Sequence, residues 1–136
     1  MPSSLVQTPL MRIEHIAFNV SDPVAMANWY CVHLQLRVVR HIPHPTQTHF
    51  LADSGSTILE IYCNPADQVP DYKLMDPLLL HLAFASSDPT MDSRKLVSAG
   101  ATFVSETQLA DGSYLIMMRD PWGLALQLCK RSTPLL

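Results

Sequence analysis

The amino-acid sequence predicts an α+β fold built from two copies of one βαβββ module. The first observation is an internal repeat, because residues 15–23 and 81–89 are identical at six of nine positions. The second is the offset of 66 residues, from position 15 to position 81, which is close to half of the 136-residue chain. The third is that each copy passes from an apolar, strand-like run into Asp-Pro, a pair that favours the start of a helix.

In the first copy, residues 11–20 are the expected first strand, because β-branched and apolar residues dominate that run. Asp22 is expected to cap a helix that ends at about Leu34. The apolar stripe of this helix is predicted to consist of Val24, Ala27, Cys31 and Leu34. Three strands are expected to follow, at 36–41, 47–52 and 57–63. The turn between the last two is predicted at Asp53-Ser54-Gly55.

The second copy repeats this order. A strand is expected at 78–85, and Asp88 caps a helix to about Ala99, where Gly100 ends it. The remaining strands are predicted at 102–105, 113–118 and 124–129, with the turn Asp120-Pro121-Trp122-Gly123 before the last. The modules therefore span 11–63 and 78–130. We expect one domain over 1–136, with a proline-containing linker at 64–77 and loose tails at 1–10 and 131–136.

Composition excludes several classes of function. The chain is 48% hydrophobic and 15% charged, which is typical of a protein with a packed core. Its net charge of −3 disfavours nucleic acid as a partner. No apolar run is long enough to span a membrane, and the first residues lack the basic and apolar regions of a signal peptide. Three cysteines without a CxxC pair indicate reduced thiols. We expect a cytoplasmic protein that binds a small molecule.

Four polar residues occupy matching places in the two modules. Side chains alternate between the faces of a strand, and the more uniformly apolar face is the one that a helix can cover. This places His15 and His81 on the opposite face of each first strand. Glu60 and Gln127 lie on the corresponding face of each last strand. The two spacings within a module, 45 and 46 residues, are nearly equal.

These residue types point to a metal site. A carboxylate on an apolar strand face is costly unless it is paired or coordinated. Two imidazoles, one carboxylate and one amide oxygen would suit a divalent transition ion. With one carboxylate the site would keep a charge of about +1, which favours an anionic or enolate-like ligand. Taken singly, each histidine has a hydrogen-bonded core role as its alternative, and Glu60 could pair with a lysine or line an oligomer interface.

The chain resembles the vicinal oxygen chelate superfamily, which holds glyoxalase I, bleomycin and fosfomycin resistance proteins, extradiol dioxygenases and methylmalonyl-CoA epimerase. The similarity covers about residues 11–130, and its carriers are 13–18, 57–61, 81–84 and 120–128. The resemblance implies a half-open barrel around a divalent ion of zinc, nickel, cobalt, manganese or iron. It implies His15, Glu60, His81 and Gln127 as the ligands. It also implies a homodimer, in some members with modules exchanged between chains.

The chain differs at two positions from the residues that are typical of glyoxalase I. That enzyme usually has Glu where this chain has Gln127, and a neutral amide cannot act as a base. Glu60 is then the one carboxylate in the expected ligand set, which looks like the epimerase set with its Glu and Gln exchanged. Leu124 replaces the family's Asn after the turn. One-base proton transfer is therefore favoured over a two-base epimerisation.

The leading hypothesis is a glyoxalase-like metalloenzyme, a lyase or isomerase that chelates vicinal oxygens of a small substrate. Glu60 would be the catalytic base, shifting a proton at a carbon next to an oxygen that the metal holds. Four further side chains are candidates for the substrate pocket, with ordinary packing or surface placement as the alternative for each. They are Trp29, Tyr62, Tyr114 and Arg119.

Two other functions stay open at this stage. One is a metal-free, drug-binding protein of the bleomycin-resistance type, against which the three strong ligand types count. The other is an Fe(II) dioxygenase, because two His and one carboxylate form the facial triad, although dioxygenase relatives usually take that carboxylate from the last strand. The histidines within residues 41–49 are expected to lie on an exposed hairpin without a metal role, because two prolines prevent a helix there.

Overall fold

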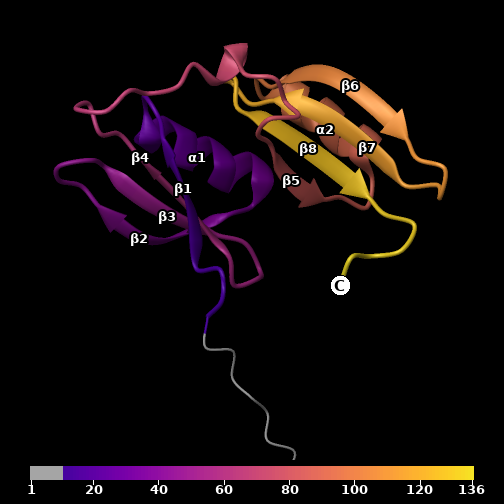
Figure 1. Ribbon diagram of the computed structural model, residues 1–136, viewed down its shortest axis with the longest axis horizontal. Helices are drawn as coiled ribbons and strands as arrows, with labels where there is room; N and C mark the ends of the chain where they lie inside the picture. Colours follow the sequence, from indigo (N-terminus) through magenta and orange to yellow (C-terminus); the bar gives the residue numbers. More distant parts are fainter. Residues whose placement is uncertain (1–10) are drawn as a thin grey trace, which may run out of the picture. The chain divides into compact units, whose positions relative to one another are not determined.

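Each half of the chain forms a four-stranded sheet with one helix against it, as Figure 1 shows in the computed structural model. The structure describes residues 11–136, so the tail expected at 1–10 lies outside the described residues. The chain divides into two units between Val69 and Pro70. Within the described range, no helix has both the length and the apolar character that a membrane crossing requires.

The first unit has the strand order β1-β4-β3-β2. Its elements are β1 (His15–Asn19), α1 (Pro23–Leu34), β2 (Arg37–Ile42), β3 (Thr48–Ala52) and β4 (Ile58–Tyr62). β1 pairs with β4 in parallel, while β3 pairs with β4 and β2 antiparallel. A parallel neighbour of β1 requires the chain to cross over, and α1 begins that crossover.

The second unit repeats this topology with the order β5-β8-β7-β6. Its elements are a 3₁₀ helix (Tyr72–Leu74), β5 (Leu82–Ala85), α2 (Pro89–Ser98), β6 (Thr102–Gln108), β7 (Tyr114–Arg119) and β8 (Ala125–Lys130). β5 and β8 are parallel, and the other pairs are antiparallel. The predicted α+β fold with two βαβββ modules is therefore confirmed, and each sheet is open rather than closed.

The repeated Asp-Pro pairs start both helices, as predicted. Asp22 Oδ1 accepts a hydrogen bond from the Ala25 backbone N–H at 3.1 Å, and Asp88 Oδ1 accepts one from the Met91 N–H at 3.1 Å. Each bond satisfies a backbone donor that the first helical turn leaves free. Gly100, with φ +108°, follows the end of α2 in a conformation that favours glycine.

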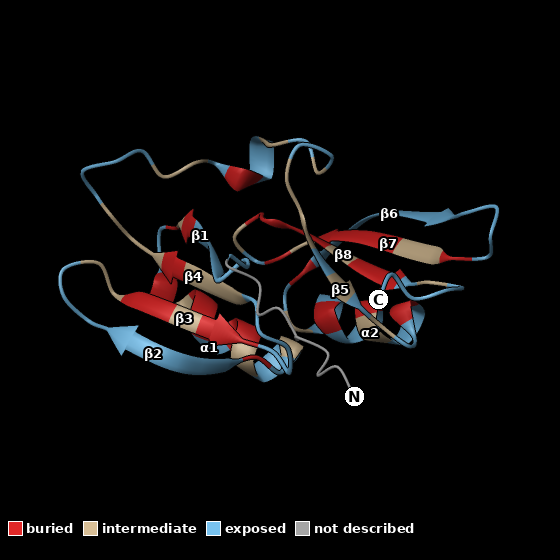
Figure 2. Ribbon diagram, turned by 60° about the horizontal axis from the view of Figure 1, so that its bottom comes forward, coloured by how far each residue is buried: buried red, intermediate tan, exposed pale blue. Residues whose placement is uncertain are grey.

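The predicted stripe of α1 is wrong in part. Val24 is 51% exposed, whereas the buried face of the helix includes Met26, Ala27 and Tyr30. Figure 2 shows the buried residues of each unit gathered where its helix meets its sheet. Because α1 carries apolar side chains on most of its sides, its periodicity does not select one face, and packing against the sheet decides the matter.

Three strand boundaries also differ from the prediction, the first being that β1 begins at His15 rather than at residue 11. β5 begins at Leu82 rather than at residue 78, because Asp76 starts a turn: its carbonyl accepts from the Leu79 N–H and its side chain accepts from the Leu78 N–H. The leucines at 78–80 have strand-like composition, but the Asp-Pro pair before them directs the backbone into this turn. β6 is longer than expected and extends to Gln108.

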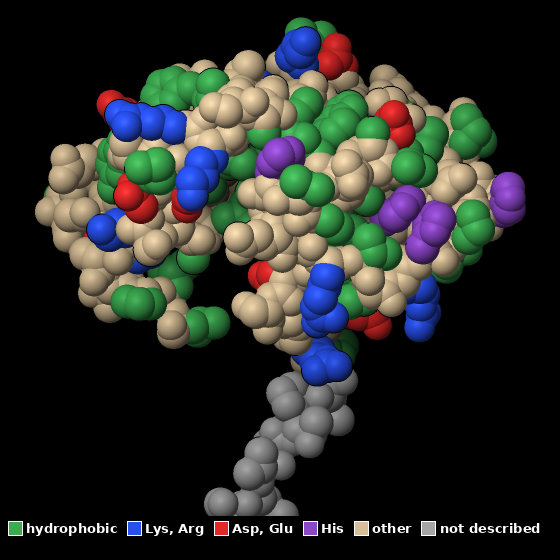
Figure 3. Space-filling model, turned by 180° about the vertical axis from the view of Figure 1, so that it is seen from behind, with side chains coloured by type: hydrophobic (Ala, Val, Ile, Leu, Met, Phe, Trp, Pro, Cys, Tyr) green, Lys and Arg blue, Asp and Glu red, His purple; other side chains and the backbone are tan. Residues whose placement is uncertain are grey.

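Histidine side chains gather on the back of the first unit (Figure 3). The rings of His41 on β2 and His49 on β3 stack with centroids 4.2 Å apart, in positions that face each other across the two strands. His41 is exposed, as expected for this hairpin, but His49 is only 7% exposed. Burial lowers the pKa of His49 from its ordinary value, and the neighbouring His41 lowers it further, although the hydrogen bond to the Gln47 carbonyl opposes this.

This lowered pKa predicts an acid-sensitive first unit. A histidine whose pKa is lower in the folded state than in the unfolded one binds its proton more readily on unfolding. The contribution of His49 to the free energy of unfolding is therefore largest above about pH 6.5 and is lost as the pH falls below that value. We expect His49→Phe to reduce the loss of unfolding free energy between pH 7 and pH 5.5, measured by urea titration. The control His44→Phe, at an exposed position, should lose as much unfolding free energy over this pH range as the unchanged protein. An equal loss in His49→Phe would show that His49 does not cause the acid sensitivity.

Candidate metal half-sites and an adjacent pocket

The first unit brings two of the predicted ligands together. Ala17 on β1 lies opposite Glu60 on β4, and His15, two residues earlier on β1, shares their face of the sheet. The His15 Nε2 atom lies 3.2 Å from Glu60 Oε2. On the other side of the ring, His15 Nδ1 lies 2.9 Å from Glu14 Oε1. The histidine is thus held between two carboxylates.

This arrangement fits a bound cation. In the neutral tautomer that donates from Nδ1 to Glu14, the His15 Nε2 lone pair faces the Glu60 carboxylate, whereas a protonated ring donates to both carboxylates. A proton or a metal ion between Nε2 and Oε2 removes that repulsion. Two ligands each about 2.1 Å from a zinc-like ion lie roughly 3.0–3.4 Å apart for angles of about 90–110°. The observed 3.2 Å lies within this range.

The second unit has the same register. Ala83 on β5 lies opposite Gln127 on β8, as Ala17 lies opposite Glu60. His81 immediately precedes β5, and its Nδ1 donates to the Pro77 carbonyl at 2.8 Å. Because a carbonyl can only accept, the neutral ring keeps its lone pair on Nε2, the nitrogen that a metal would bind.

The Gln127 side chain has its own neighbour in the second unit. The Cys129 thiol donates to Gln127 Oε1 at 3.3 Å. Within each unit of residues 11–136, the structure shows no group of three or more His, Cys, Asp and Glu side chains close enough to hold a metal. The structure thus brings one predicted pair into contact, His15 and Glu60 of the first unit. That His81 and Gln127 bind the same ion as this pair stays a prediction.

The aromatic candidates for substrate contact have different surroundings. Tyr62 shares the face of β4 with Glu60 and is partly exposed. Trp29 is 7% exposed and packs edge-on against Tyr30, with ring centroids 5.4 Å apart. Tyr114 donates its hydroxyl to Glu106 and lies on the face of β7 opposite to the one that Gln127 shares. These positions favour Tyr62 as a neighbour of the ligands.

Arg119 has a structural role. Its Nη1 donates to the carbonyls of Tyr72 and Gly123, each at 3.0 Å, and its Nη2 donates to the Met75 carbonyl at 2.9 Å. These three bonds attach the segment around the 3₁₀ helix to the turn between β7 and β8. A contact between Arg119 and a substrate stays a prediction.

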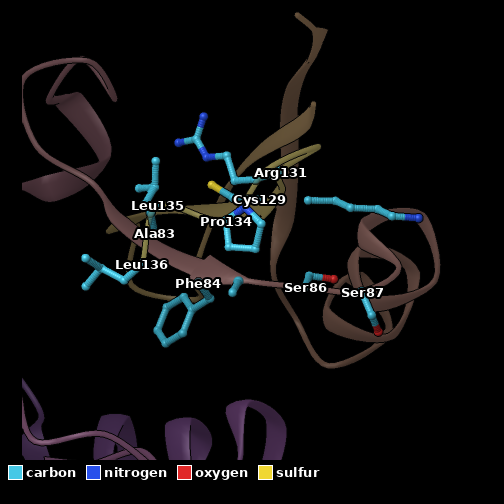
Figure 4. A pocket seen from close by; sticks show the side chains of 11 residues that line it. Ala83, Phe84, Ser86, Ser87, Cys129, Arg131, Pro134, Leu135 and Leu136 are labelled. Atoms are coloured by element: carbon cyan, nitrogen blue, oxygen red, sulfur yellow. The ribbon is translucent and has the colours of Figure 1, made fainter. Parts of the chain in front are cut away.

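A pocket of about 600 Å³ lies in the second unit, beside the open edge of β5. Ala83 and Cys129, which share the face of Gln127, form part of it. Figure 4 shows Phe84 on one side of the pocket and Pro134 and Leu135 of the terminal segment on another. The sequence interpretation treated 131–136 as a loose tail and missed this pocket. The signal that could have indicated it is the apolar run at 134–136 after the basic pair at 130–131.

The repeated βαβββ topology, with a histidine at its first strand and a carboxylate or amide on its last, defines a class of two-module α+β proteins. The chain belongs to the Glyoxalase/Bleomycin resistance protein/Dioxygenase superfamily, whose family model matches residues 12–128. The comparison with curated proteins finds no match.

Solved structures of known proteins share this fold. A glyoxalase family protein from Enterococcus faecalis is 28% identical with a TM-score of 0.69, over 89% of this chain and 98% of that one. TnmS3, an antibiotic binding protein from Streptomyces sp. CB03234, is 17% identical with a TM-score of 0.71, over 93% and 100%. A lactoylglutathione lyase from Agrobacterium tumefaciens is 17% identical with a TM-score of 0.64, over 90% and 95%. At 17% identity the last two show a shared fold alone.

Proposed function

We propose that this protein is a glyoxalase-like metalloenzyme, a lyase or isomerase that shifts a proton on a small oxygenated substrate. The observation that carries the proposal is the placement of His15 between Glu14 and Glu60, with its Nε2 atom 3.2 Å from Glu60 Oε2. A divalent cation at that point satisfies both groups. We further expect the enzyme to be a cytoplasmic homodimer.

The proposed ligands are His15, Glu60, His81 and Gln127. A bound ion of zinc, nickel, cobalt, manganese or iron would supply Lewis-acid polarisation of two substrate oxygens. Glu14 and the Pro77 carbonyl orient the two imidazoles by holding their Nδ1 atoms. A carboxylate has two oxygens, so one oxygen of Glu60 can face the ion while the other accepts a proton from the substrate carbon. Gln127 is neutral and takes no part in that transfer.

The experiment that tests this proposal is a metal titration. Protein stripped with EDTA should bind one divalent ion per chain in isothermal titration calorimetry. Removing an orienting neighbour of a ligand typically costs about 10- to 100-fold in affinity, so we expect about 100-fold or more for His15→Ala and for His81→Ala. The control His44→Ala removes an exposed histidine and should leave the affinity unchanged. If His81→Ala leaves the affinity for the ion unchanged, then His81 does not bind the ion that His15 binds.

The pocket beside β5 supports a second candidate, a metal-free small-molecule binding protein. Its walls are largely apolar, with Phe84, Pro134 and Leu135 among them. The antibiotic binding protein TnmS3 has the same fold, so the fold permits that function. The metal titration separates the two candidates, because a binding protein of this kind would take up no ion.

A further inference from the structure

The first sheet has an open face, which we name the ligand face because His15 and Glu60 lie on it. The opposite face is the one that α1 packs against, and there Phe18, Leu51 and Ile61 are buried. Side chains on the ligand face are therefore the ones within this unit that can contact a molecule held at His15 and Glu60.

Phe50 on β3 is a neighbour of both proposed ligands. It lies directly opposite Glu60 in the antiparallel pair of β3 and β4. Its ring meets the His15 ring edge-on, with the ring centroids 6.2 Å apart. Phe50 is partly exposed, so it presents an apolar surface beside the two polar side chains.

A β-bulge in β2 places two arginines on the ligand face. Arg37 lies opposite Ala52 and Arg40 lies opposite Phe50, with the shift in register between Val38 and Arg40. Residues three apart on a regular strand point to opposite faces, but the extra residue of the bulge brings these two to one face. Both arginines are exposed on β2, the outer strand of this sheet (Figure 1).

The second unit shows that the fold does not require these two charges. Its outer strand β6 has the same bulge, but Thr102 and Ser105 stand where β2 has Arg37 and Arg40. Charges and bulges on outer strands often prevent pairing with other chains. Because β6 is also an outer strand and has hydroxyls at these positions, that role alone does not account for two cations on the ligand face.

The two arginines have the position and the freedom to bind an anion. Among the described residues, neither Arg37 nor Arg40 forms an ion pair with a carboxylate. β2 lies two strands from β4, and neighbouring strands are about 4.7–4.9 Å apart, so the backbones of Arg40 and Glu60 are about 10 Å apart. Phe50 lies between them. The ligand face thus passes from a carboxylate and an imidazole, across an aromatic ring, to two cations.

We propose that Arg37 and Arg40 bind a terminal carboxylate of the substrate and so determine its specificity. The inference rests on the proposed function and deepens it by naming a substrate class. That class is an elongated molecule with two vicinal oxygens held at His15 and Glu60, a middle part over Phe50 and a carboxylate at the far end. A planar guanidinium matches a carboxylate by parallel hydrogen bonds, so arginine suits this task.

The test is calorimetric titration of the full chain, loaded with Zn²⁺ and freed of excess metal, with suberic acid monohydroxamate. This probe has two vicinal oxygens at one end and a carboxylate at the other. The matching monoamide lacks the distant charge, and acetohydroxamate lacks the long chain. We expect the acid to bind about 10-fold more tightly than the amide, an effect between those of an exposed ion pair and a charge-assisted hydrogen bond.

A double variant, Arg37→Gln with Arg40→Gln, should remove the preference for the acid and leave the affinity for the amide within about twofold. Unchanged binding of the amide shows that the variant is folded and that its metal site is intact. Arg94→Gln on α2 makes a similar charge change in the second unit and should keep the preference. A double variant that still prefers the acid would overturn the proposal.

A second measurement needs no variant. Raising the salt concentration from about 50 to 500 mM should reduce the advantage of the acid over the amide, because salt screens exposed charges. An advantage that does not change with salt would overturn the proposal, as would an acid that binds no more tightly than the amide while acetohydroxamate still binds. If the protein takes up no Zn²⁺, or binds none of the three probes, the proposed metal site is wrong and this inference falls with it.

Discussion

Replacing Glu60 by glutamine is expected to lower the rate of proton transfer by about 10²- to 10⁴-fold, the usual contribution of a positioned general base. Glutamine has nearly the shape of glutamate and keeps one oxygen that can face a cation, but it cannot accept a proton from carbon. The reaction is measured as deuterium exchange, by NMR in D₂O, at the carbon-bound hydrogen of α-hydroxycarbonyl probes. The probes include the hemithioacetal of methylglyoxal. Each measurement is made at a saturating concentration of the divalent metal ion.

The matched control for Glu60→Gln is Glu14→Gln. Glu14 contacts the Nδ1 side of His15, so this variant removes the same charge from the other side of the ring. It should weaken metal binding and have a much smaller effect on exchange at saturating metal. Equal exchange rates in Glu60→Gln and the unchanged protein would remove Glu60 as the base, while the metal titration would still decide whether the site binds an ion.

Replacing Gly123 by alanine is expected to destabilise the second unit by about 2–5 kcal/mol. Gly123 has φ +94°, a left-handed conformation that costs about 1–2 kcal/mol for a residue with a Cβ. An added Cβ would also lie 2.7 Å from the Lys73 Cβ and 2.8 Å from the Lys73 backbone, an overlap that adds roughly 1–3 kcal/mol. To relieve it, the 3₁₀ helix must move away from the turn, which disturbs the Arg119 hydrogen bonds.

Gly112→Ala is the matched control for Gly123→Ala. Gly112 has nearly the same conformation, φ +91°, but nothing lies within 4 Å of an added Cβ. It should cost only the conformational part, about 1–2 kcal/mol. The free energy of unfolding of both variants is measured by urea titration, and hydrogen exchange of residues 70–136 assigns the loss to the second unit. Equal losses in the two would show that the contact with Lys73 does not matter.

The elements of each module were predictable where the physical signal is local. The two Asp-Pro pairs start helices because the carboxylate accepts a nearby backbone N–H and the proline suits the first helical position. The alternation of side chains assigned Glu60 and Gln127 to one face of each last strand, and the register places them opposite Ala17 and Ala83. Strand alternation has a period of two whatever the rest of the chain does, so sequence position is sufficient to assign a face.

Other features could not be read from local patterns. The leucines before His81 have strand composition, but hydrogen bonds to Asp76 turn the backbone there. Arg119 was a substrate candidate by its position after a strand, and its three carbonyl partners come from segments as far as 47 residues away. A side chain of this length has many possible partners, and only the folded chain selects among them.

The duplication, the order of elements and the strand faces of His15, Glu60 and Gln127 could be predicted from the sequence alone. The order and the faces depend on helix caps and side-chain alternation, which act over a few residues, while the duplication is visible by aligning the chain with itself. The folded chain was needed to show that Glu60 lies beside His15, that α1 packs Met26 and Tyr30 against the sheet, and that the terminal segment forms a pocket with β5. The physical reason is that these contacts join residues distant in sequence, where packing and charge, rather than local preference, select the partner.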